Sequence, residues 1–208
     1  TSLQPEDALQ INLGATFNKI IKKTQIGFRM NIYNNYIDNK ILALPTKNLF
    51  VWSITNVGKV NVIGSDIELN LIYAFTENTS IEAQGNLTYQ EVKDKTDRES
   101  PTYNHQLAYT PKITSNSRIS LHHKNLSWHS SAFYVGERYS LNQNTNANLV
   151  EAFTLFDSSL GYKIKLNSNH LLKAQVGIKN IFDKSYNFIQ FFVMPGRNYF
   201  LKINYEFN

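Results

Sequence analysis

The stretch PGRNYFLKINYEF, residues 195 to 207, places an apolar or aromatic side chain at every second position of its second half. Those side chains are Tyr199, Leu201, Ile203, Tyr205 and Phe207, and mostly polar residues stand between them. Because successive side chains of a β-strand point to opposite faces, the alternation predicts a strand with one apolar and one polar face. Such a strand suits a soluble sheet, and equally a barrel wall that faces lipid on one side and water on the other.

The composition narrows the classes of protein. The chain of 208 residues has no cysteine, which excludes disulfides, zinc-thiolate sites and cysteine nucleophiles. No apolar run approaches the roughly 18 residues that a membrane-spanning helix needs. The beginning, TSLQPED, lacks the basic start and apolar core of a signal peptide, so we expect a mature form or an excised piece. Twelve tyrosines and 13 phenylalanines beside only 18% charged residues suit a β-protein with a polar lumen.

The net charge of +5 raises the question of nucleic acid. The lysines and arginines are scattered singly, however, and form no basic stripe interleaved with stacking aromatics. We therefore expect no nucleic-acid partner.

Alternation with a two-residue period recurs along the whole chain. Residues 24 to 38, for example, carry Ile26, Phe28 and Met30 on one count and Gln25, Gly27 and Arg29 on the other. The same reading predicts nine strands, at residues 9–18, 24–38, 63–75, 81–89, 113–122, 126–136, 153–164, 172–180 and from 197 onward.

The connections between these strands alternate in length. Tight turns are expected at residues 19–23, 76–78, 123–125 and 165–169, and long loops at 39–58, 91–112, 137–152 and 181–196. In an up-and-down antiparallel sheet, this order puts every tight turn at one edge and every long loop at the other. Outer-membrane barrels have that asymmetry, whereas a soluble sandwich has no reason to sort its loops. The sequence therefore predicts an all-β, antiparallel, up-and-down transmembrane β-barrel, with a soluble sandwich as the alternative.

The odd number of strands has a consequence for closure. In an antiparallel barrel of nine strands the first and last would meet parallel, and bacterial single-chain barrels have even counts. An open sheet would expose unpaired backbone groups to lipid at two edges. We therefore expect the carboxy-terminal part of a larger barrel; a tenth strand hidden within residues 44 to 55 is the competing interpretation.

The ending VGIKNIFDKSYNFIQFFVMPGRNYFLKINYEFN resembles the carboxy-terminal signature of TonB-dependent outer-membrane receptors. That signature is a strand running into N-[IL]-F-D-K-x-Y, then a loop, P-G-R-x-[YF] and a final strand with an aromatic end. LQPEDALQINLG, TNVGKVNVIGSDIELNL, HQLAYTPKITSNSRISL and YVGERY resemble other segments of the family, in the same order. The signature residues in this chain are Asn180, Phe182, Asp183, Pro195, Gly196 and Arg197.

The resemblance implies that residues 1 to 208 form about nine or ten strands at the carboxy-terminal end of a 22-stranded barrel in the bacterial outer membrane. The amino-terminal plug domain of the family is expected to be absent from this chain. The implied function is active uptake of a scarce, bulky nutrient, cobalamin or a ferric siderophore, and the short last loop is more like that of cobalamin receptors. No cofactor is implied. The implied partners are outer-membrane lipid, the metal-chelate or cobalamin ligand, the missing amino-terminal barrel and plug, the TonB complex acting through the plug, and the barrel-assembly machinery.

The last loop is dense in aromatic residues, which suggests ligand contact, with anchoring at the lipid interface as an equal competitor. Pro195 and Gly196 are expected to shape the return of the loop, and Arg197 to pair bidentately with a lumenal carboxylate. Tyr205 and Phe207 resemble the terminal signal that the barrel-assembly machinery reads, although Lys202 stands where the family often has glycine and Asn208 follows the aromatic. The candidate ligand-binding residues are Tyr186, Phe188, Gln190, Phe191 and Phe192.

Catalysis is the weakest hypothesis. The five histidines, His105, His122, His123, His129 and His170, are spread over different hairpins, and most lie toward the tight-turn edge of the predicted sheet. No catalytic constellation and no metal-ligand spacing is present, so no catalytic or metal-binding residues are expected. The rival functions are a soluble or surface carbohydrate-binding β-sheet protein and an outer-membrane barrel hydrolase.

Overall fold

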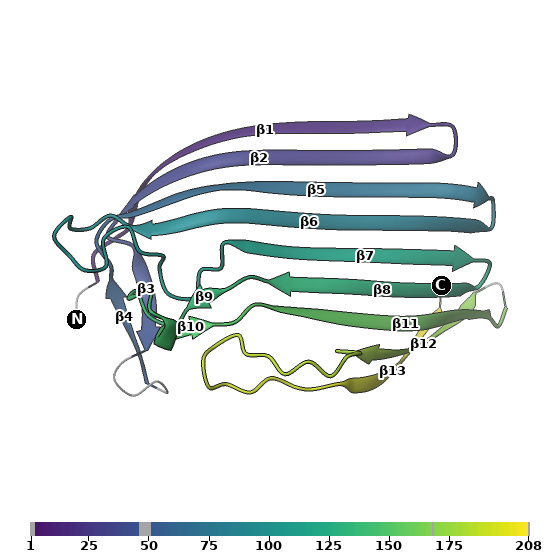
Figure 1. Cartoon of the computed structure of the whole chain (residues 1–208). Coiled ribbons are helices and arrows are strands. Elements are labelled where there is room, and N and C mark those ends of the chain that lie inside the picture. The colour runs from purple at the N-terminus through teal and green to yellow at the C-terminus, as the bar shows by residue number, and fades with distance from the viewer. Residues whose placement is uncertain (1–2, 46–50, 168, 208) are drawn as a thin grey trace.

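The computed structural model describes residues 3–45, 51–167 and 169–207, which form one antiparallel sheet of nine long strands (Figure 1). Within the sheet, each strand pairs with the wall strand before it and the wall strand after it along the chain. The short strands in the loops are not part of this sheet. The all-β, up-and-down prediction is confirmed. The nine strands are β1 (Asp7–Ile21), β2 (Thr24–Asp38), β5 (Val60–Thr76), β6 (Thr79–Asp94), β7 (Ile113–His123), β8 (Leu126–Val135), β11 (Phe153–Lys165), β12 (His170–Lys179) and β13 (Asn198–Phe207).

Two small hairpins and one helical turn lie outside this sheet. β3 (Ile41–Pro45) pairs with β4 (Trp52–Asn56), and β9 (Arg138–Tyr139) pairs with β10 (Leu149–Val150), beside the 3-10 turn η1 (Asn146–Asn148). A tenth wall strand within residues 44 to 55 is therefore wrong, because β3 and β4 pair only with each other; residues 46–50 of that stretch lie outside the described part. No helix among the described residues is long and apolar enough to cross a membrane.

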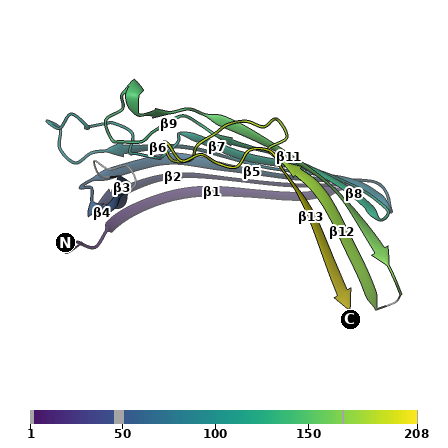
Figure 2. The ribbon, with the colours of Figure 1, turned by 90° about the horizontal axis from the view of Figure 1, so that it is seen from below.

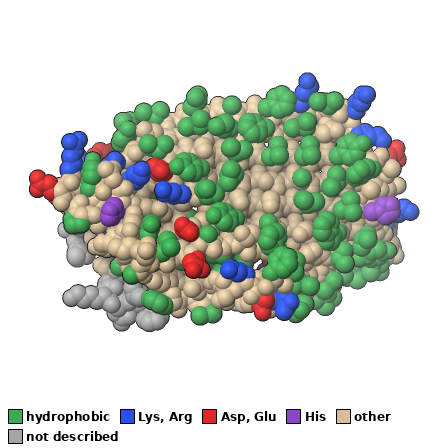
Figure 3. Space-filling model, in the orientation of Figure 1, with side chains coloured by type: hydrophobic (Ala, Val, Ile, Leu, Met, Phe, Trp, Pro, Cys, Tyr) green, Lys and Arg blue, Asp and Glu red, His purple; other side chains and the backbone are tan. Residues whose placement is uncertain are grey.

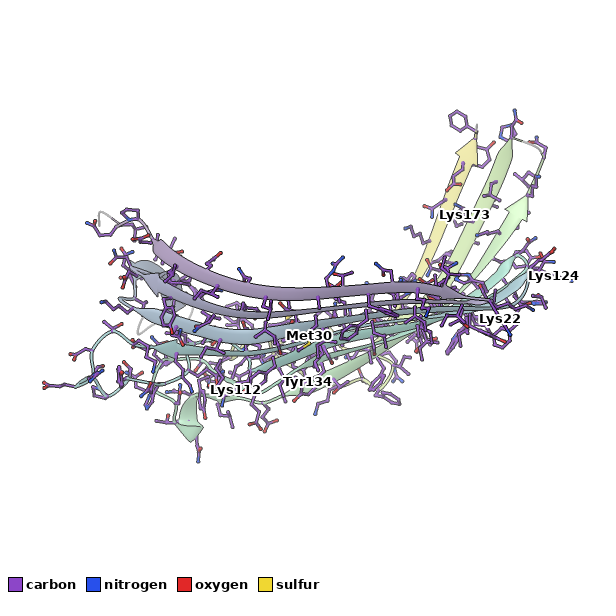
Figure 4. The ribbon with its side chains drawn as sticks, turned by 90° about the horizontal axis from the view of Figure 1, so that it is seen from above. Lys22, Met30, Lys112, Lys124, Tyr134 and Lys173 are labelled. Carbon is purple, nitrogen blue, oxygen red and sulfur yellow. The ribbon has the colours of Figure 1, made fainter. Side chains whose placement is uncertain are left out.

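The sheet is a single curved layer. Figure 2 shows β1 to β8 as a shallow arc, from which the ends of β12 and β13 turn away, and Figure 4 shows the same arc from the opposite side. No second sheet covers either face of the nine strands in the described residues, so the soluble sandwich is wrong. The outer edges of β1 and β13 remain open in this sheet.

Cross-strand register keeps apolar residues opposite apolar residues. Leu13 lies opposite Ile32, and Phe17 opposite Phe28, while Thr16 lies opposite Arg29. Since side chains alternate between faces, this register gathers the apolar side chains on one face and the polar ones on the other. The apolar face has no protein cover: Leu13, for example, is 74% exposed. Figure 3 shows hydrophobic side chains spread over the middle of the strands, with most charged side chains at the two ends.

The two ends of the sheet differ, as the alternating connections predict. Lys22 and Lys124 lie in tight turns at one end, where Figure 4 labels both, and each has a positive φ of 52°. The four long connections meet at the other end (Figure 1). The small buried core also lies toward that end: Val60, Val92 and Leu107 pack together with Leu42 and Val57. The buried core of the described residues therefore lies where the strands meet the loops, and the rest of the wall has no protein layer over either face.

Candidate ligand-binding loops

The candidate site is built by the four long loops. We call residues 39–59 the first loop, 95–112 the second, 136–152 the third and 180–197 the fourth; each joins two neighbouring wall strands at the same end of the sheet. Because that end carries the long loops of an up-and-down barrel, it corresponds to the outer side of a membrane barrel.

The first and second loops are joined by packing and by backbone contacts. The rings of Trp52 and Tyr109 lie with their centroids 5.7 Å apart. The amide of Lys59 donates to the Thr96 hydroxyl over 3.0 Å, and the amide of Lys95 donates to the Lys59 carbonyl over 2.8 Å. Gly58, with a φ of +35°, is required here because a Cβ atom would lie 2.2 Å from the Thr96 methyl group. Burial raises the pKa of the Tyr109 phenol, and the nearby Gln190 backbone and Arg138 charge oppose that rise.

Two asparagines join the third loop to the second. The Asn144 side chain accepts from the Gln106 amide over 2.7 Å and donates to the Gln106 carbonyl over 2.9 Å, as a neighbouring strand would. Asn142 Oδ1 accepts from the Ala108 amide over 2.9 Å. The second loop thus obtains partners for backbone groups that a loop inside a protein otherwise leaves unpaired.

The fourth loop lies against the third. The guanidinium of Arg138 donates to the carbonyls of Asn187 and Phe188, and Gln190 Nε2 donates to the Ala147 carbonyl over 3.3 Å. All four loops are therefore linked in sequence, from the first to the fourth.

An aromatic cluster forms where the fourth loop meets the wall. Phe153 is 3% exposed and lies 4.8 Å from Tyr186 and 5.2 Å from Phe188, measured between ring centroids. Phe133 of β8 contacts Phe188 at 6.3 Å. The edge-to-face angle of 85° between Phe153 and Phe188 is a favourable geometry for aromatic rings.

The structure places the five predicted ligand-binding residues in three settings. Tyr186 and Phe188 belong to the aromatic cluster, and Gln190 binds the third loop. Phe192 is 38% exposed, and its amide donates to the Ile189 carbonyl over 3.1 Å. Phe191 is the most open of the five, with 64% exposure, and its φ of 67° is rare for a bulky residue. Ligand contact by these residues stays a prediction.

Three of the signature residues hold the base of the fourth loop. Asn180 is 4% exposed: its amide donates to Asp157 Oδ1 over 2.8 Å, and its side chain bonds both backbone groups of Lys184. Asp183 Oδ1 accepts from the Arg197 amide over 2.7 Å. These bonds bring the two ends of the loop together.

The remaining signature residues border this base. A Cβ atom on Gly196 would lie 2.7 Å from Asp183 Oδ1, so the close approach of the carboxylate requires glycine. Pro195 is exposed beside it. Phe182 is 72% exposed and packs edge-to-face on Phe156 at 5.3 Å.

The expected bidentate pairing of Arg197 with a lumenal carboxylate is not formed among the described residues and stays a prediction. No ion pair among the described residues includes Arg197, whose guanidinium Nη1 reaches the Ile181 carbonyl at 3.5 Å. The neighbouring carboxylate, that of Asp183, accepts from the backbone amide of Arg197.

The proposed assembly signal lies at the tight-turn end. Tyr205 hydrogen-bonds His170 Nδ1, and the two rings stack with centroids 5.6 Å apart. Phe207 lies opposite His170 in the register and is 75% exposed. An assembly role for Tyr205 and Phe207 stays a prediction.

The polar face of the wall forms an open hollow of about 500 Å³. Charged and hydrogen-bonding groups line it, among them Glu68, Arg118, His129 and Asp157. In the described part of the chain no three His, Asp or Glu side chains are grouped so that they could hold a metal ion. His105 lies far from the other four histidines, in the second loop, where its Nδ1 is 3.2 Å from the Asn142 carbonyl.

Reasoning from the sequence missed the residues that join the loops. Arg138 stands in the quoted motif YVGERY, but nothing in the motif says that its partners lie in the fourth loop. Asn142 and Asn144 lie in an asparagine-rich run, NQNTNAN, which was a usable sign of side chains that bind backbone.

Comparisons with known proteins agree with this architecture. The family model "TonB dependent receptor-like, beta-barrel" matches residues 1–181. The vitamin B12 transporter BtuB of Vibrio vulnificus (strain YJ016) is 26% identical over 211 residues, which cover 89% of this chain and 30% of that protein.

Solved structures with the same fold include the copper transporter OprC, with a TM-score of 0.69 and 19% identity over 99% of this chain and 32% of that one. The ferric citrate transporter FecA, in its unliganded form, has a TM-score of 0.70 and 16% identity over 97% of this chain and 31% of that one. At these identities the likeness shows the fold alone. The chain spans about a third of the length of these relatives.

Proposed function

Because this chain belongs to the TonB-dependent receptor-like β-barrel family, we propose that it supplies wall and outer loops to a receptor that imports cobalamin or a ferric siderophore. Members of this family are outer-membrane β-barrels that act as transporters and receptors, not enzymes. The apolar face of the sheet accordingly faces lipid, and the polar face forms the lumen wall.

The observation that carries the proposal is the linked group of outer loops. Four loops converge at one end, and the fourth presents the open ring of Phe191 beside a packed aromatic cluster. The positive φ of Phe191 has a backbone cost that is typical of residues kept for a functional reason. A vestibule of aromatic rings and amides suits a large ligand with both apolar and hydrogen-bonding surface.

Cobalamin is the first ligand to test. The relative that is 26% identical over most of this chain is named as a vitamin B12 transporter, whereas the solved structures at lower identity are named for copper and ferric citrate. The proposed partners are a plug domain in the lumen, the TonB complex acting through it, the barrel-assembly machinery and further strands that complete the wall.

The test uses the complete receptor, expressed in cells that lack every other route for cobalamin uptake. We expect labelled cyanocobalamin to enter these cells, and uptake to stop when TonB is removed. Phe191→Ala should raise the half-saturating concentration about three- to tenfold, the effect of losing roughly 1 kcal/mol of contact. Phe182→Ala is the matched control, because Phe182 lies in the same loop but packs on Phe156 of the lipid-facing side.

Each outcome decides a different part of the proposal. If cyanocobalamin does not enter but ferric siderophores do, the siderophore form of the proposal is supported. If neither cyanocobalamin nor ferric siderophores enter the cells when TonB is present, the proposal is contradicted. Equal affinities for the wild type and Phe191→Ala contradict the role of the fourth loop.

A further inference from the structure

Arg138 is a charged residue that the proposed function does not use. It opens β9 in the third loop and is only 2% exposed. Arginine is almost never buried to this extent unless its charge is compensated. Its surroundings therefore call for an explanation.

Every hydrogen bond of the Arg138 guanidinium goes to a backbone carbonyl. Within the third loop, Nη1 donates to the carbonyls of Gly136 and Glu151 over 3.3 and 3.4 Å. Across to the fourth loop, Nε and Nη2 donate to the Phe188 carbonyl over 3.3 and 3.1 Å, and Nη2 also donates to the Asn187 carbonyl. The one side chain thus binds four carbonyls from two loops.

In the described residues, no carboxylate takes part in this arrangement. The ion pairs found in the described part of the chain do not include Arg138. The positive charge lies over the Phe153 ring instead, 5.5 Å from its centroid, which is within the range of a cation–π interaction. Burial lowers the pKa of the guanidinium, although it stays charged at any physiological pH.

The packing between the two loops is otherwise loose. A hollow of about 480 Å³ lies between them, lined by Glu151, Tyr186 and Gln190 among others. Besides the Arg138 bonds, one polar contact crosses this gap in the part of the chain that the structure describes, the bond from Gln190 to the Ala147 carbonyl at 3.3 Å. Arg138 therefore makes most of the polar connection between the two loops.

We propose that Arg138 is a positioning residue that clasps the fourth loop to the third and so fixes the aromatic cluster and Phe191 at the mouth of the barrel. The inference goes beyond the proposed function, because it concerns the relative position of two loops and holds for any ligand. The clasp needs a guanidinium: its planar fork presents five donors in fixed directions, whereas the lysine ammonium is a point charge with three. Lysine cannot make all five of these hydrogen bonds at once.

The test measures the distance between the loops directly. The complete receptor, with any cysteine elsewhere replaced by serine, carries spin labels at Asn146→Cys in the third loop and Val193→Cys in the fourth; this chain contributes no cysteine of its own. Both positions are exposed. Pulsed electron resonance then gives the distribution of label-to-label distances in outer membranes without ligand.

We expect Arg138→Ala to widen this distribution by about twofold or more, because the fourth loop loses most of its polar contact with the third. Arg138→Lys should widen it to the same extent, while Arg98→Ala, which removes an exposed arginine of the second loop, should leave it unchanged. A wild-type distribution in Arg138→Ala overturns the clasp. A wild-type distribution in Arg138→Lys overturns the requirement for the guanidinium fork.

Loss of the whole fold is excluded separately. Each variant is first checked for heat-modifiable migration, which reports an intact barrel. If Arg138→Ala does not reach the membrane, Arg138→Gln replaces it, since its amide keeps donors for only one of the two loops; an unchanged distribution in that variant also overturns the clasp.

Discussion

Two glycines on the polar face of the wall lie opposite aromatic residues, and the aromatic rings occupy the space that a larger side chain would need. Tyr33 lies opposite Gly64 in the register, and Phe200 lies opposite Gly177. A Cβ atom on Gly64 would come within 2.5 Å of the Tyr33 ring, and one on Gly177 within 2.5 Å of the Phe200 ring. In both pairs the glycine lets an aromatic ring lie flat on the neighbouring strand.

Replacing one of these glycines should therefore destabilise the wall. We expect Gly64→Ala to lower the free energy of unfolding by about 1–3 kcal/mol, the usual cost of overpacking, because its Cβ would also lie 2.7 Å from the Tyr89 carbonyl, which cannot rotate away. The measurement is urea unfolding of the receptor refolded into lipid vesicles.

Gly85→Ala is the matched control in the neighbouring strand. Its Cβ would meet only the Asn116 carbonyl, at 3.9 Å, an ordinary contact. A control variant as unstable as Gly64→Ala would show that any alanine in these strands is harmful, and the explanation by ring contact would be wrong.

The sequence predicted the faces of the strands but not such pairs. Alternation assigns Leu13 to the apolar side and Thr16 to the polar side, because the two-residue period belongs to the strand alone. The Tyr33–Gly64 pair depends on the register between two strands, which no local pattern specifies. The contacts of Arg197 with Asp183 and Ile181 were missed for a related reason, because they lie across a loop whose course the sequence does not reveal.

At the scale of elements, the number of wall strands was predicted correctly, and several of these strands were predicted too short. Residues 9–18 alternate, but β1 continues to Ile21, where it still pairs with Thr24. β6 extends to Asp94, beyond the predicted end at residue 89. Near the strand ends the side chains no longer alternate, while the backbone ladder continues, supported on the loop side by the core around Val60 and Val92.

The segment before β1 is tied to the first loop in a way that depends on pH. Glu6 accepts from the Ile41 amide over 2.6 Å and from Lys40 Nζ over 2.9 Å. The bond from the Ile41 amide, followed by the Lys40 charge, lowers the pKa of Glu6 below its ordinary value of 4.5. A carboxyl group whose pKa is lower in the folded state stabilises that state above its ordinary pKa and loses this contribution as the pH falls through the lowered value.

Hydrogen exchange at the Ile41 amide tests this tie. After correction for the intrinsic rate at each pH, protection should stay constant from pH 7 down to about 4.5 and then decline. Glu6→Ala should expose the amide at every pH, while Glu77→Ala, in a tight turn at the far end, should not. Protection that persists unchanged to pH 3 in the wild type would contradict the assignment.

For the whole molecule, the direction of the two edge strands limits what can complete the wall. With nine strands in an up-and-down sheet, β1 and β13 both run from the loop end to the turn end. Two copies joined edge to edge in the same orientation would meet parallel, so copies of this sheet do not make an antiparallel barrel. An odd number of strands of other sequence is needed.

The open edges determine which amides become protected when the wall is complete. In residues 1–208 alone, refolded in detergent, the outward-facing amides of β1 and β13 should exchange about as fast as unpaired groups, while those of β6 are slow. In the complete receptor the same edge amides should be slowed at least about tenfold. Fast exchange of the β1 edge amides in the complete receptor would show that the wall stays open there.

The contacts between the four loops limit how the loops can be exchanged between receptors. Trp52 touches the second loop, Asn142 and Asn144 hold the second to the third, and Arg138 binds the fourth. If a single loop is replaced by that of a relative, the new loop lacks matching partners in the neighbouring loops, and the neighbouring loops lose the contacts that they made with the original. Chimeras that are meant to change ligand selectivity should therefore exchange all four loops together, including the residues that join them.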